Sequence, residues 1–271
     1  ALSFLKIFKL LAVNGQQVSP RGQLVLEVEN VSYSLPPYIR FSNFKCRKLN
    51  LAYIKQEFLW YLRGDPVDTS IGNHAAMWRN LVNLDGSINS NYGKYVFTNG
   101  QFDRVVKTLQ QDRDSRQAVI VILQPEHLIM DTLDIPCTYS MSFRIRKGKL
   151  NMTVRMRSQD VIYGMGNDAP CFSFIHEMVF NALLVHYPDL QYGEYYHSVD
   201  SLHVYAKHFA MLDELATIIC GEDEAELGEY SLILCPKISG PDEVKFLRDN
   251  KFNDIPKEYQ FSRWLREGLS V

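Results

Sequence analysis

Cys137 is a candidate nucleophile, and it lies directly after a proline in the segment DIPCTYS. A thiolate attacks carbon centres when a nearby cation favours the charged form of the sulfur. Arg157 can reach Cys137 if the two residues lie on partner strands of a hairpin. A buried structural cysteine is the alternative, and the spacing leaves both interpretations open.

A second group of polar side chains lies in residues 154–174, VRMRSQDVIYGMGNDAPCFSF. Its GMGNDA segment matches a loose glycine fingerprint for dinucleotides, which requires a strand, the glycines and a helix within a strand–helix–strand unit. We expect no such unit here, because Pro170 follows the motif at once. We expect instead a loop that approaches a neighbour closely, at the rim of a pocket for a polar ring.

Arginines could bind an anion in two places. Arg155 and Arg157 share one face of an expected hairpin, where guanidinium groups either meet solvent or converge on a phosphate. Arg113 and Arg116 precede a strand in DRDSRQAV, where a charged turn is the favoured interpretation.

Two further positions could bind or transfer protons. Glu57 lies within the apolar helical stretch IKQEFLWYL, where a carboxylate costs free energy unless it is partnered or functional. His203 and Tyr205 alternate in SLHVYAKHF, so they share one face if this segment is a strand. A structural role and a hydroxyl-binding role are both open for that pair.

The composition excludes several classes of protein. The chain has 271 residues, of which 46% are hydrophobic and 22% charged, and its net charge of −2 argues against direct nucleic-acid binding. Five cysteines without a CxxC pair, and the absence of HExxH, predict a reducing compartment and no metal site. The apolar start ALSFLKIFKLLAV is too short to span a bilayer, so we expect a packed helix and a soluble cytoplasmic protein.

Hydrophobic periodicity predicts an α+β fold in a single domain, residues 1–271. Helices are expected at 49–62, 102–112 and 172–187, and a short buried strand at 117–123. Residues 22–35 read as a half-buried strand with Leu24, Leu26 and Val28 on one side. A hairpin at 139–157, turning at Lys147–Lys149, is the clearest local signal.

Taken in order, these segments resemble the thymidylate synthase family. The matching segments span most of the chain: Arg21, QEFLWYLRGD (56–65), MWRN and GSINSNYGK (77–94), DRDSR (112–116), IPC (135–137), MRSQDV and GNDA (156–169), and SLHVYAKH (201–208). Within the family, INSNYG, MRSQDVIYGMGND and Thr138 after the cysteine are most similar to the bacteriophage deoxycytidylate (dCMP) hydroxymethylase branch. The resemblance implies a mixed β-sheet packed with helices, with a sheet face forming a homodimer interface.

The resemblance also implies roles for single residues. Cys137 corresponds to the nucleophile that adds to C6 of the pyrimidine, Glu57 to the carboxylate that organises water and proton transfers, and Tyr92 to the catalytic wall. The implied nucleotide-binding residues are Arg21, Arg157, Ser158, Gln159, Asp168, His203 and Tyr205, with Arg116 contributed by the second subunit to the phosphate. The implied folate side comprises Trp78, Asp160 and Gly164. The co-substrate would be 5,10-methylenetetrahydrofolate, with no metal.

Asp168 stands where synthases carry the asparagine that reads uracil. Cytosine presents an amino donor at C4 and an acceptor at N3, and a protonated Asp168 complements both; an ionised one would serve once N3 gains a proton. A mismatched base leaves buried polar groups unpaired, at about 1–3 kcal/mol each. Asp168 therefore points to a cytosine nucleotide, and the resemblance implies hydroxymethylation of dCMP.

Several alternatives stay open. Methylation of dCMP would produce dihydrofolate, and CMP or dUMP could replace dCMP. Gln117 replaces a second arginine of the family, which leaves one phosphate contact in doubt and keeps a non-catalytic nucleotide-binding module open. Leu81 stands where synthases often carry tryptophan, and the ending REGLSV departs from the usual C-terminal sequence.

Overall fold

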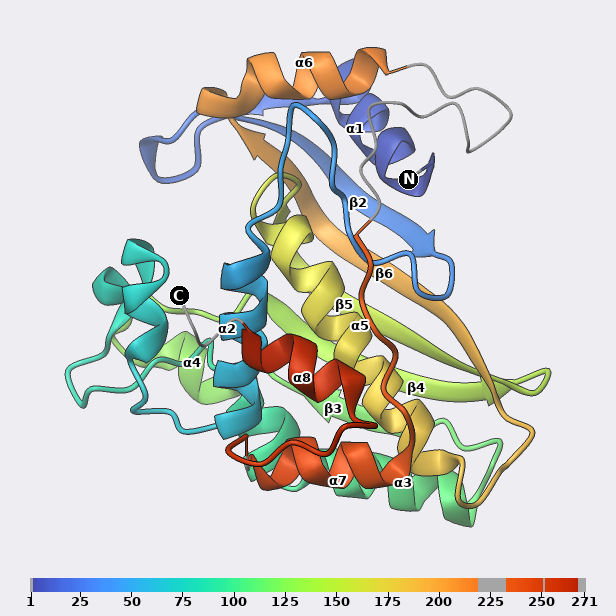
Figure 1. Cartoon of the computed structure of the whole chain (residues 1–271). Helices are drawn as coiled ribbons and strands as arrows, with labels where there is room; N and C mark the ends of the chain where they lie inside the picture. Colours follow the sequence, from blue (N-terminus) through green and yellow to red (C-terminus); the bar gives the residue numbers. More distant parts are fainter. Residues whose placement is uncertain (1, 219–232, 251, 268–271) are drawn as a thin grey trace.

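The computed structural model describes residues 2–218, 233–250 and 252–267. Its centre is a six-stranded sheet in the order β1-β2-β6-β5-β4-β3 (Figure 1). The strands are β1 (Gln16–Val18), β2 (Val25–Leu35), β3 (Val119–Val121), β4 (Thr138–Arg146), β5 (Lys149–Asp160) and β6 (Gln191–Tyr205). Strands β5 and β6 pair in parallel, and every other neighbouring pair is antiparallel.

Helices pack on this mixed sheet, which confirms the α+β prediction (Figure 1). The helices are α1 (Leu2–Asn14), α2 (Leu51–Arg63), α3 (Gln101–Gln111), α4 (Pro125–Ile129), α5 (Gly164–Leu183), α6 (Phe209–Thr217), α7 (Pro241–Asp249) and α8 (Gln260–Arg266). Shorter helical turns are η1 (Pro20–Gly22), η2 (Ser70–Asn73), η3 (Ala76–Leu81), η4 (Lys94–Thr98) and η5 (Ala206–His208). Helix α5 packs on β5 and β6 and contacts α2, α3 and α7, whereas α1 and α6 pack together at the β2 end.

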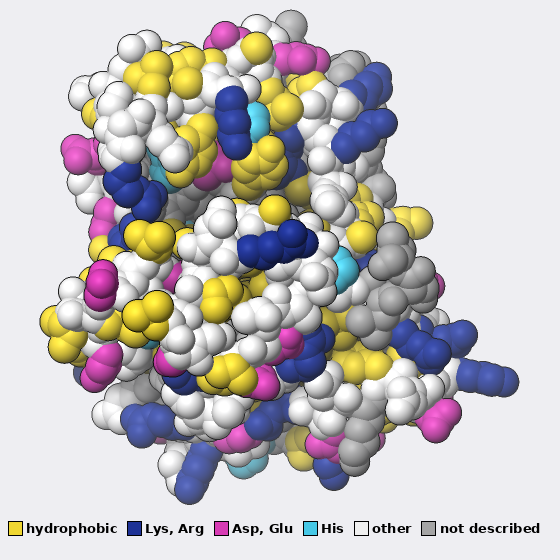
Figure 2. Space-filling view, turned by 90° about the vertical axis from the view of Figure 1, so that its left-hand side faces the viewer, with side chains coloured by type: hydrophobic (Ala, Val, Ile, Leu, Met, Phe, Trp, Pro, Cys, Tyr) yellow, Lys and Arg dark blue, Asp and Glu magenta, His cyan; other side chains and the backbone are white. Residues whose placement is uncertain are grey.

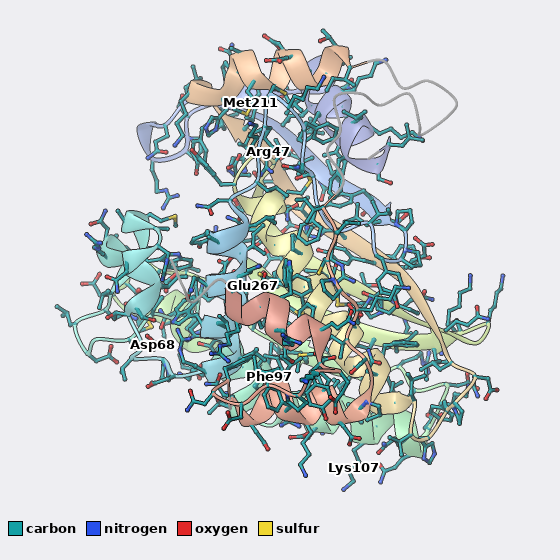
Figure 3. The ribbon with its side chains drawn as sticks, in the orientation of Figure 1. Arg47, Asp68, Phe97, Lys107, Met211 and Glu267 are labelled. Carbon is teal, nitrogen blue, oxygen red and sulfur yellow. The ribbon has the colours of Figure 1, made fainter. Side chains whose placement is uncertain are left out.

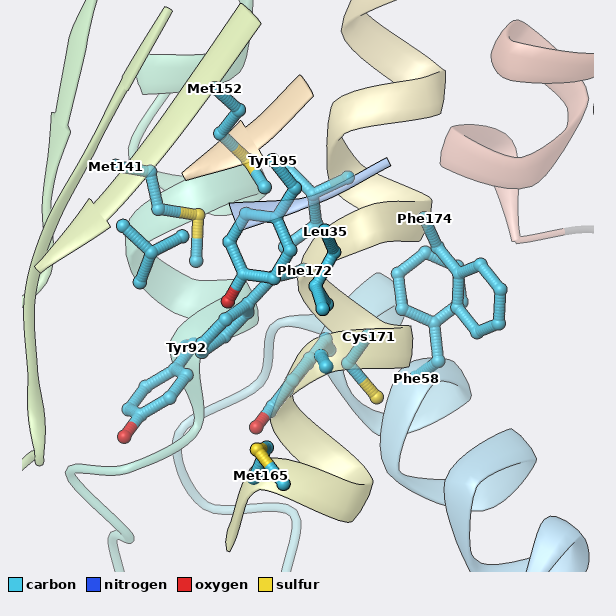
Figure 4. Packing of buried hydrophobic residues seen from close by; sticks show 14 of the residues in the cluster. Leu35, Phe58, Tyr92, Met141, Met152, Met165, Cys171, Phe172, Phe174 and Tyr195 are labelled. Atoms are coloured by element: carbon cyan, nitrogen blue, oxygen red, sulfur yellow. The ribbon is translucent and has the colours of Figure 1, made fainter. Parts of the chain in front are cut away.

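The core lies where α5 meets the sheet and α2. Phe172 of α5 packs toward Tyr92, and Phe174 packs edge-on against Phe58 of α2 with ring centroids 5.0 Å apart (Figure 4). These rings are buried, and burial of aromatic and aliphatic surface is the main source of folding free energy. The core therefore fixes α5 and α2 relative to the sheet, and both helices carry candidate site residues.

Local signals explain where two central elements begin and end. Asn50 caps α2 by accepting a hydrogen bond from the Tyr53 backbone at 3.0 Å, and Gly64 ends the helix in the left-handed region at φ 59°. The predicted hairpin is confirmed: β4 and β5 join through Lys147 and Gly148, both at positive φ, as a tight type I′ turn requires.

Two expected strands are present with differences in detail, and one expected loop is wrong. Leu24 is 40% exposed and precedes β2, whereas Leu26 and Val28 are partly buried against the core; the most buried side chains, Val25, Val31 and Leu35, lie on the other face of the strand. The expected strand at 117–123 shortens to Val119–Val121. The GMGNDA segment is helical rather than a loop, since α5 begins at Gly164 and contains Pro170.

The other face of the sheet carries polar side chains. Tyr139 donates to Asp200 at 2.8 Å, and Arg155 donates to Ser142 at 3.3 Å. The family resemblance assigns a homodimer interface to a sheet face, and for this chain that assignment stays a prediction.

The remaining expectations concern termini, cysteines and membranes. The expected N-terminal helix is confirmed as α1, which buries Phe4, Phe8 and Leu11. Cys46, Cys137, Cys171 and Cys235 are free thiols, and Cys220 lies outside the described residues. Within the described ranges, no helix has the length and apolar character needed to cross a bilayer.

Candidate active site

Glu57 is a buried carboxyl group on α2, with 4% of its surface exposed. The hydroxyls of Tyr53 and Tyr61, one turn on either side, donate to Oε1 at 3.1 and 3.4 Å. The thiol of Cys171 lies 3.8 Å from Oε2. Burial raises the pKa of Glu57 to about 7, although these three donors oppose the shift. A carboxyl group of that pKa can both give and take a proton near neutral pH.

Trp78 is connected to Glu57 through Tyr53. The indole N–H of Trp78 donates to the Tyr53 hydroxyl at 2.8 Å, and the Trp78 ring packs on Trp60 with centroids 5.2 Å apart. Sequence reasoning missed Tyr53 and Tyr61, although their spacing of four residues from Glu57 places all three on one helix face. That spacing was the available signal.

Asp168 lies in the second turn of α5 and is half-buried. Gln159 donates from Nε2 to its Oδ2 atom at 3.3 Å. Burial, and then the negative charge of Glu57, raise the pKa of Asp168 well above its usual range. Burial therefore favours the neutral carboxylic acid over the carboxylate, and such a group can donate as well as accept.

Tyr92 stands between two aromatic rings, Tyr61 at 5.5 Å and Phe172 at 6.0 Å between centroids. Burial raises its pKa well above 10, and the charge of Cys137 raises it further. The phenol therefore stays neutral and forms a rigid aromatic wall beside the thiol (Figure 4 shows the packing of Tyr92 and Phe172).

Cys137 directly precedes β4 and is half-buried. Burial raises the pKa of its thiol, whereas the positive charges of Arg157 and Arg21 oppose that shift. The backbone N–H of Arg157 donates to the Cys137 carbonyl at 2.8 Å. Its guanidinium donates to the carbonyls of Ile135 at 2.7 Å and Pro136 at 3.2 Å. The structure thus brings Arg157 to the thiol, as the hairpin spacing predicted.

The candidate phosphate and sugar residues gather at the end of β5 and β6. Ser158 pairs with Ser201, and Asp160 pairs with His203, in the parallel register. The ring of His203 meets Tyr205 edge-on at 5.3 Å.

The phenol of Tyr205 is a common neighbour of several charged groups. Burial raises its pKa, with contributions from Asp160 and Cys137, and the charges of Arg21 and Arg157 oppose the shift. Arg21, exposed in η1 at φ 53°, therefore lies on the same side as the thiol.

A pocket of about 280 Å³ opens beside Tyr205, lined also by Gln23, Leu24, Ala206 and Lys207. Figure 2 shows a hollow across this side of the molecule, with Lys and Arg side chains along one margin. An anionic ligand can therefore approach this end of the sheet from solvent.

The residues assigned to the folate side lie around the start of α5. Both carboxylate oxygens of Asp160 accept backbone hydrogen bonds, from Ile162 at 3.1 Å and Tyr163 at 2.8 Å. A Cβ atom placed on Gly164 would lie 3.5 Å from Oδ2 of Asp168, an ordinary contact. Asp160 therefore shapes the turn that leads to Asp168, and Gly164 lies next to the carboxyl group.

The GMGNDA segment departs from the sequence expectation in one further respect. Strand β5, helix α5 and the parallel strand β6 do form a strand–helix–strand unit around it. A Cβ atom on Gly166, however, would lie 1.8 Å from Nη2 of Arg47, whose guanidinium donates to the Ile162 carbonyl (Figure 3 labels Arg47). The glycine makes room for the protein's own arginine, so the motif does not form a dinucleotide site.

Two assigned features stay predictions. Arg116 is exposed between α3 and β3 and makes no hydrogen bond or ion pair within the described part of the chain. Among the described residues, no group of three or more His, Cys, Asp or Glu side chains could hold a metal ion.

Comparison with known proteins agrees with this geometry. The sequence profile of thymidylate synthase matches residues 4–221. Deoxycytidylate 5-hydroxymethyltransferases of Enterobacteria phages T6 and T4 are each 31% identical over 175 residues, which cover 61% of this chain and 71% of theirs. Deoxyuridylate hydroxymethyltransferase of Bacillus phage SP01 is 32% identical over 222 residues, covering 74% of this chain and 56% of that protein. The chain therefore belongs to the thymidylate synthase family and is a one-carbon transferase.

Proposed function

We propose that this enzyme converts dCMP, 5,10-methylenetetrahydrofolate and water to 5-hydroxymethyl-dCMP and tetrahydrofolate. The observation that carries the substrate assignment is Asp168, a half-buried carboxyl group held by Gln159 at 3.3 Å and favoured in its neutral form. Its hydroxyl donates to N3 of cytosine while its other oxygen accepts from the 4-amino group. Uracil presents a donor at N3 and an acceptor at O4, so a carboxyl group held in this same orientation would place two donors opposite each other at N3.

Cys137 performs the first covalent step in this proposal. Its thiolate adds to C6 of the pyrimidine, which makes C5 nucleophilic. The charges of Arg157 and Arg21 favour the thiolate against the opposing effect of burial. The same two arginines and Ser158 hold the phosphate, and His203 with Tyr205 binds the sugar 3′-hydroxyl.

Glu57 accepts and donates protons during the reaction in this proposal. With a pKa of about 7 it can accept or return a proton without a large free-energy cost. Tyr53 and Tyr61 hold its Oε1 atom, so the carboxyl group keeps one orientation. Tyr92 keeps the base in the plane in which Cys137 reaches C6.

The start of α5 fits a flat, hydrogen-bonding ring such as that of folate. Tyr163 is 56% exposed, and the adjacent Gly164 presents no side chain. Asp160 is fixed by two backbone amides, and Trp78 is held by Tyr53. When bound, 5,10-methylenetetrahydrofolate supplies the methylene carbon; in this proposal these residues orient it above C5.

Water is the proposed final nucleophile because the similar phage proteins named above are hydroxymethyltransferases. The SP01 protein supports a second candidate, dUMP, since its name specifies deoxyuridylate. The neutral carboxyl of Asp168 favours dCMP over that candidate. A homodimer with Arg116 reaching the partner's phosphate site is part of the proposal.

Mass spectrometry of the products from dCMP, CMP and dUMP tests the reaction. We expect dCMP to gain a hydroxymethyl group and tetrahydrofolate to form. A methyl product, one oxygen lighter, with dihydrofolate absorbance would establish methylation instead. Product from dUMP or CMP alone would reject dCMP as substrate, and nucleotide binding without product would support a non-catalytic module.

A further inference from the structure

We infer that Tyr33 is a positioning residue that fixes the Gln159 amide and thereby determines which oxygen of Asp168 carries the proton offered to the base. This inference rests on the proposed function, because it concerns recognition of the pyrimidine edge. Tyr33 lies on β2, Gln159 on β5 and Asp168 on α5, so three separate elements contribute.

The contacts form a continuous path. The Tyr33 hydroxyl donates to Oε1 of Gln159 at 2.8 Å, and Gln159 donates from Nε2 to Oδ2 of Asp168 at 3.3 Å. Gln159 is only 2% exposed. Its Nε2 atom also contacts the Met156 sulfur at 3.5 Å, so both ends of the amide are occupied.

The ring of Tyr33 is itself held in place. Strands β2 and β5 are not neighbours, and β6 lies between them. Tyr33 pairs with His197 of β6 in the strand register, and their rings stack at 4.8 Å with an interplanar angle of 10°. The Tyr195 hydroxyl and Nδ1 of His197 lie 2.7 Å apart, which fixes the imidazole beneath Tyr33. The phenol therefore reaches across β6 to the Gln159 amide.

The direction of the hydrogen bond from Tyr33 to Gln159 determines the direction of the hydrogen bond from Gln159 to Asp168. A neutral phenol that donates to Oε1 leaves only N–H groups of Gln159 to face Asp168. Oδ2 of Asp168 must then be an acceptor, since a proton there would point at another proton. The acidic proton is thus placed on Oδ1, which has no hydrogen-bond partner among the residues that the structure describes. Burial raises the pKa of Tyr33 well above 10, which keeps its hydroxyl a donor.

As a consequence, the donor and acceptor oxygens of Asp168 have fixed positions relative to the base. Oδ1–H donates to N3 of cytosine, and Oδ2 keeps a lone pair for the 4-amino group. Without the Tyr33 hydroxyl, the Gln159 amide can turn over and present its oxygen to Asp168. The carboxyl proton then bonds to Gln159 instead of N3, and selection of cytosine weakens.

The test is Tyr33→Phe, which removes one oxygen and keeps the ring. We measure kcat/KM for dCMP and for dUMP in each protein and compare their ratio with that of the wild type. We expect the dCMP:dUMP ratio to fall about tenfold, mainly through KM for dCMP, as one charge-neutral hydrogen bond predicts. General loss of packing would lower both values together and leave the ratio unchanged.

Tyr187→Phe is the matched control, because its hydroxyl also donates a 2.8 Å hydrogen bond, to the Leu109 carbonyl outside the site. Its ratio should equal that of the wild type. Gln159→Leu is a second variant for the case that Tyr33→Phe folds poorly. It should also lower the dCMP:dUMP ratio. A ratio within twofold of the wild type in both variants would overturn the inference. If the wild-type enzyme itself prefers dUMP to dCMP, the proposed substrate is wrong. That outcome is established by the wild-type measurement alone, without the variants.

Discussion

Tyr53 and Glu57 lie one turn apart on α2, and the Tyr53 hydroxyl donates to Oε1 of Glu57 at 3.1 Å while it accepts the Trp78 indole N–H at 2.8 Å. The Tyr53 hydroxyl therefore provides a hydrogen-bond partner for both Trp78, which is assigned to the folate side, and Glu57, which is assigned to proton transfer. Both groups are buried, so neither can replace this partner with bulk water.

Tyr53→Phe should destabilise the enzyme and change its pH profile. Loss of the hydroxyl leaves the Trp78 N–H unpaired, at about 1–3 kcal/mol of unfolding free energy. The hydrogen bond from Tyr53 also lowers the pKa of Glu57, so its removal should raise that pKa further above 7. Urea unfolding and the pH dependence of kcat measure the two effects. An unchanged profile would argue that Glu57 does not titrate in the rate-limiting step.

Glu57→Gln should abolish most activity and remove a pH dependence of stability. Burial raises the folded-state pKa of Glu57 from 4.5 to about 7, so the folded protein binds this proton more tightly than the unfolded chain. The stability that this group contributes is complete below about pH 4.5 and is lost as the pH rises through 7. The shift corresponds to about 3 kcal/mol.

The measurement for this variant is urea unfolding at several pH values from 5 to 8. The Glu57→Gln variant should gain stability relative to the wild type as the pH rises, by up to about 3 kcal/mol. The contributions of the other titrating groups cancel when the unfolding free energy of the wild type is subtracted from that of the variant. A constant difference across this range would mean that Glu57 is ionised throughout.

Arg157→Met should make Cys137 a weaker nucleophile. The guanidinium charge lowers the pKa of the thiol against burial, so its loss should move thiolate formation to higher pH. Iodoacetamide alkylation, followed by mass spectrometry of the Cys137 peptide, gives the midpoint. Arg155→Met is the control, since this exposed residue of the same strand contacts Ser142 instead. Equal midpoints in all three proteins would contradict the assignment.

Asp168→Asn should move substrate preference from dCMP toward dUMP. The carboxamide complements the uracil edge and meets cytosine with a mismatched group, which costs about 1–3 kcal/mol. The kcat/KM ratio should therefore change by about ten- to a hundredfold. Asp213→Asn, an exposed change on α6, controls for altered net charge. A variant that loses both substrates equally would point to a role for Asp168 in catalysis rather than in selection.

Gly166→Ala and Gly164→Ala should differ sharply although both lie at the start of α5. A Cβ atom on Gly166 would lie 1.8 Å from Nη2 of Arg47, and the guanidinium would have to leave the Ile162 carbonyl. We expect a loss of about 1–3 kcal/mol from the unpaired buried groups. Gly164→Ala meets only ordinary contacts and should be close to neutral. Chemical unfolding measures the free energy of unfolding of both variants, and equal values would contradict this prediction.

Elements set by local chemistry were predictable from the sequence. The β4–β5 hairpin follows from alternation around Lys147 and Gly148, and α2 follows from its apolar spacing and from Gly64. The parallel pairing of β5 with β6 was missed because it joins segments separated by a whole helix. Alternation predicted the side of β2 that carries Leu26 and Val28, but it did not show that Val25, Val31 and Leu35 on the other side are buried more deeply.

The candidate site divides in the same way. The motifs placed Cys137, Arg157 and Asp168 in one functional group, and the geometry brings the first two together at the hairpin. Gln159 was assigned to the substrate, but no local pattern connects it to Tyr33, more than a hundred residues earlier. Such a contact arises only when β2, β6 and β5 are assembled.

The strand order has a consequence for the nascent chain. Strand β2 pairs with the short strand β1 that precedes it, but its long partner strand, β6, ends at Tyr205 and leaves the ribosome much later. The pairing of β6 with β2 and β5, which brings the segments of Gln159 and His203 together, therefore forms late, and a partial polypeptide lacks the assembled nucleotide site. Bound nucleotide would stabilise only the complete sheet, so its presence during refolding should raise the yield of native enzyme rather than the speed of early collapse.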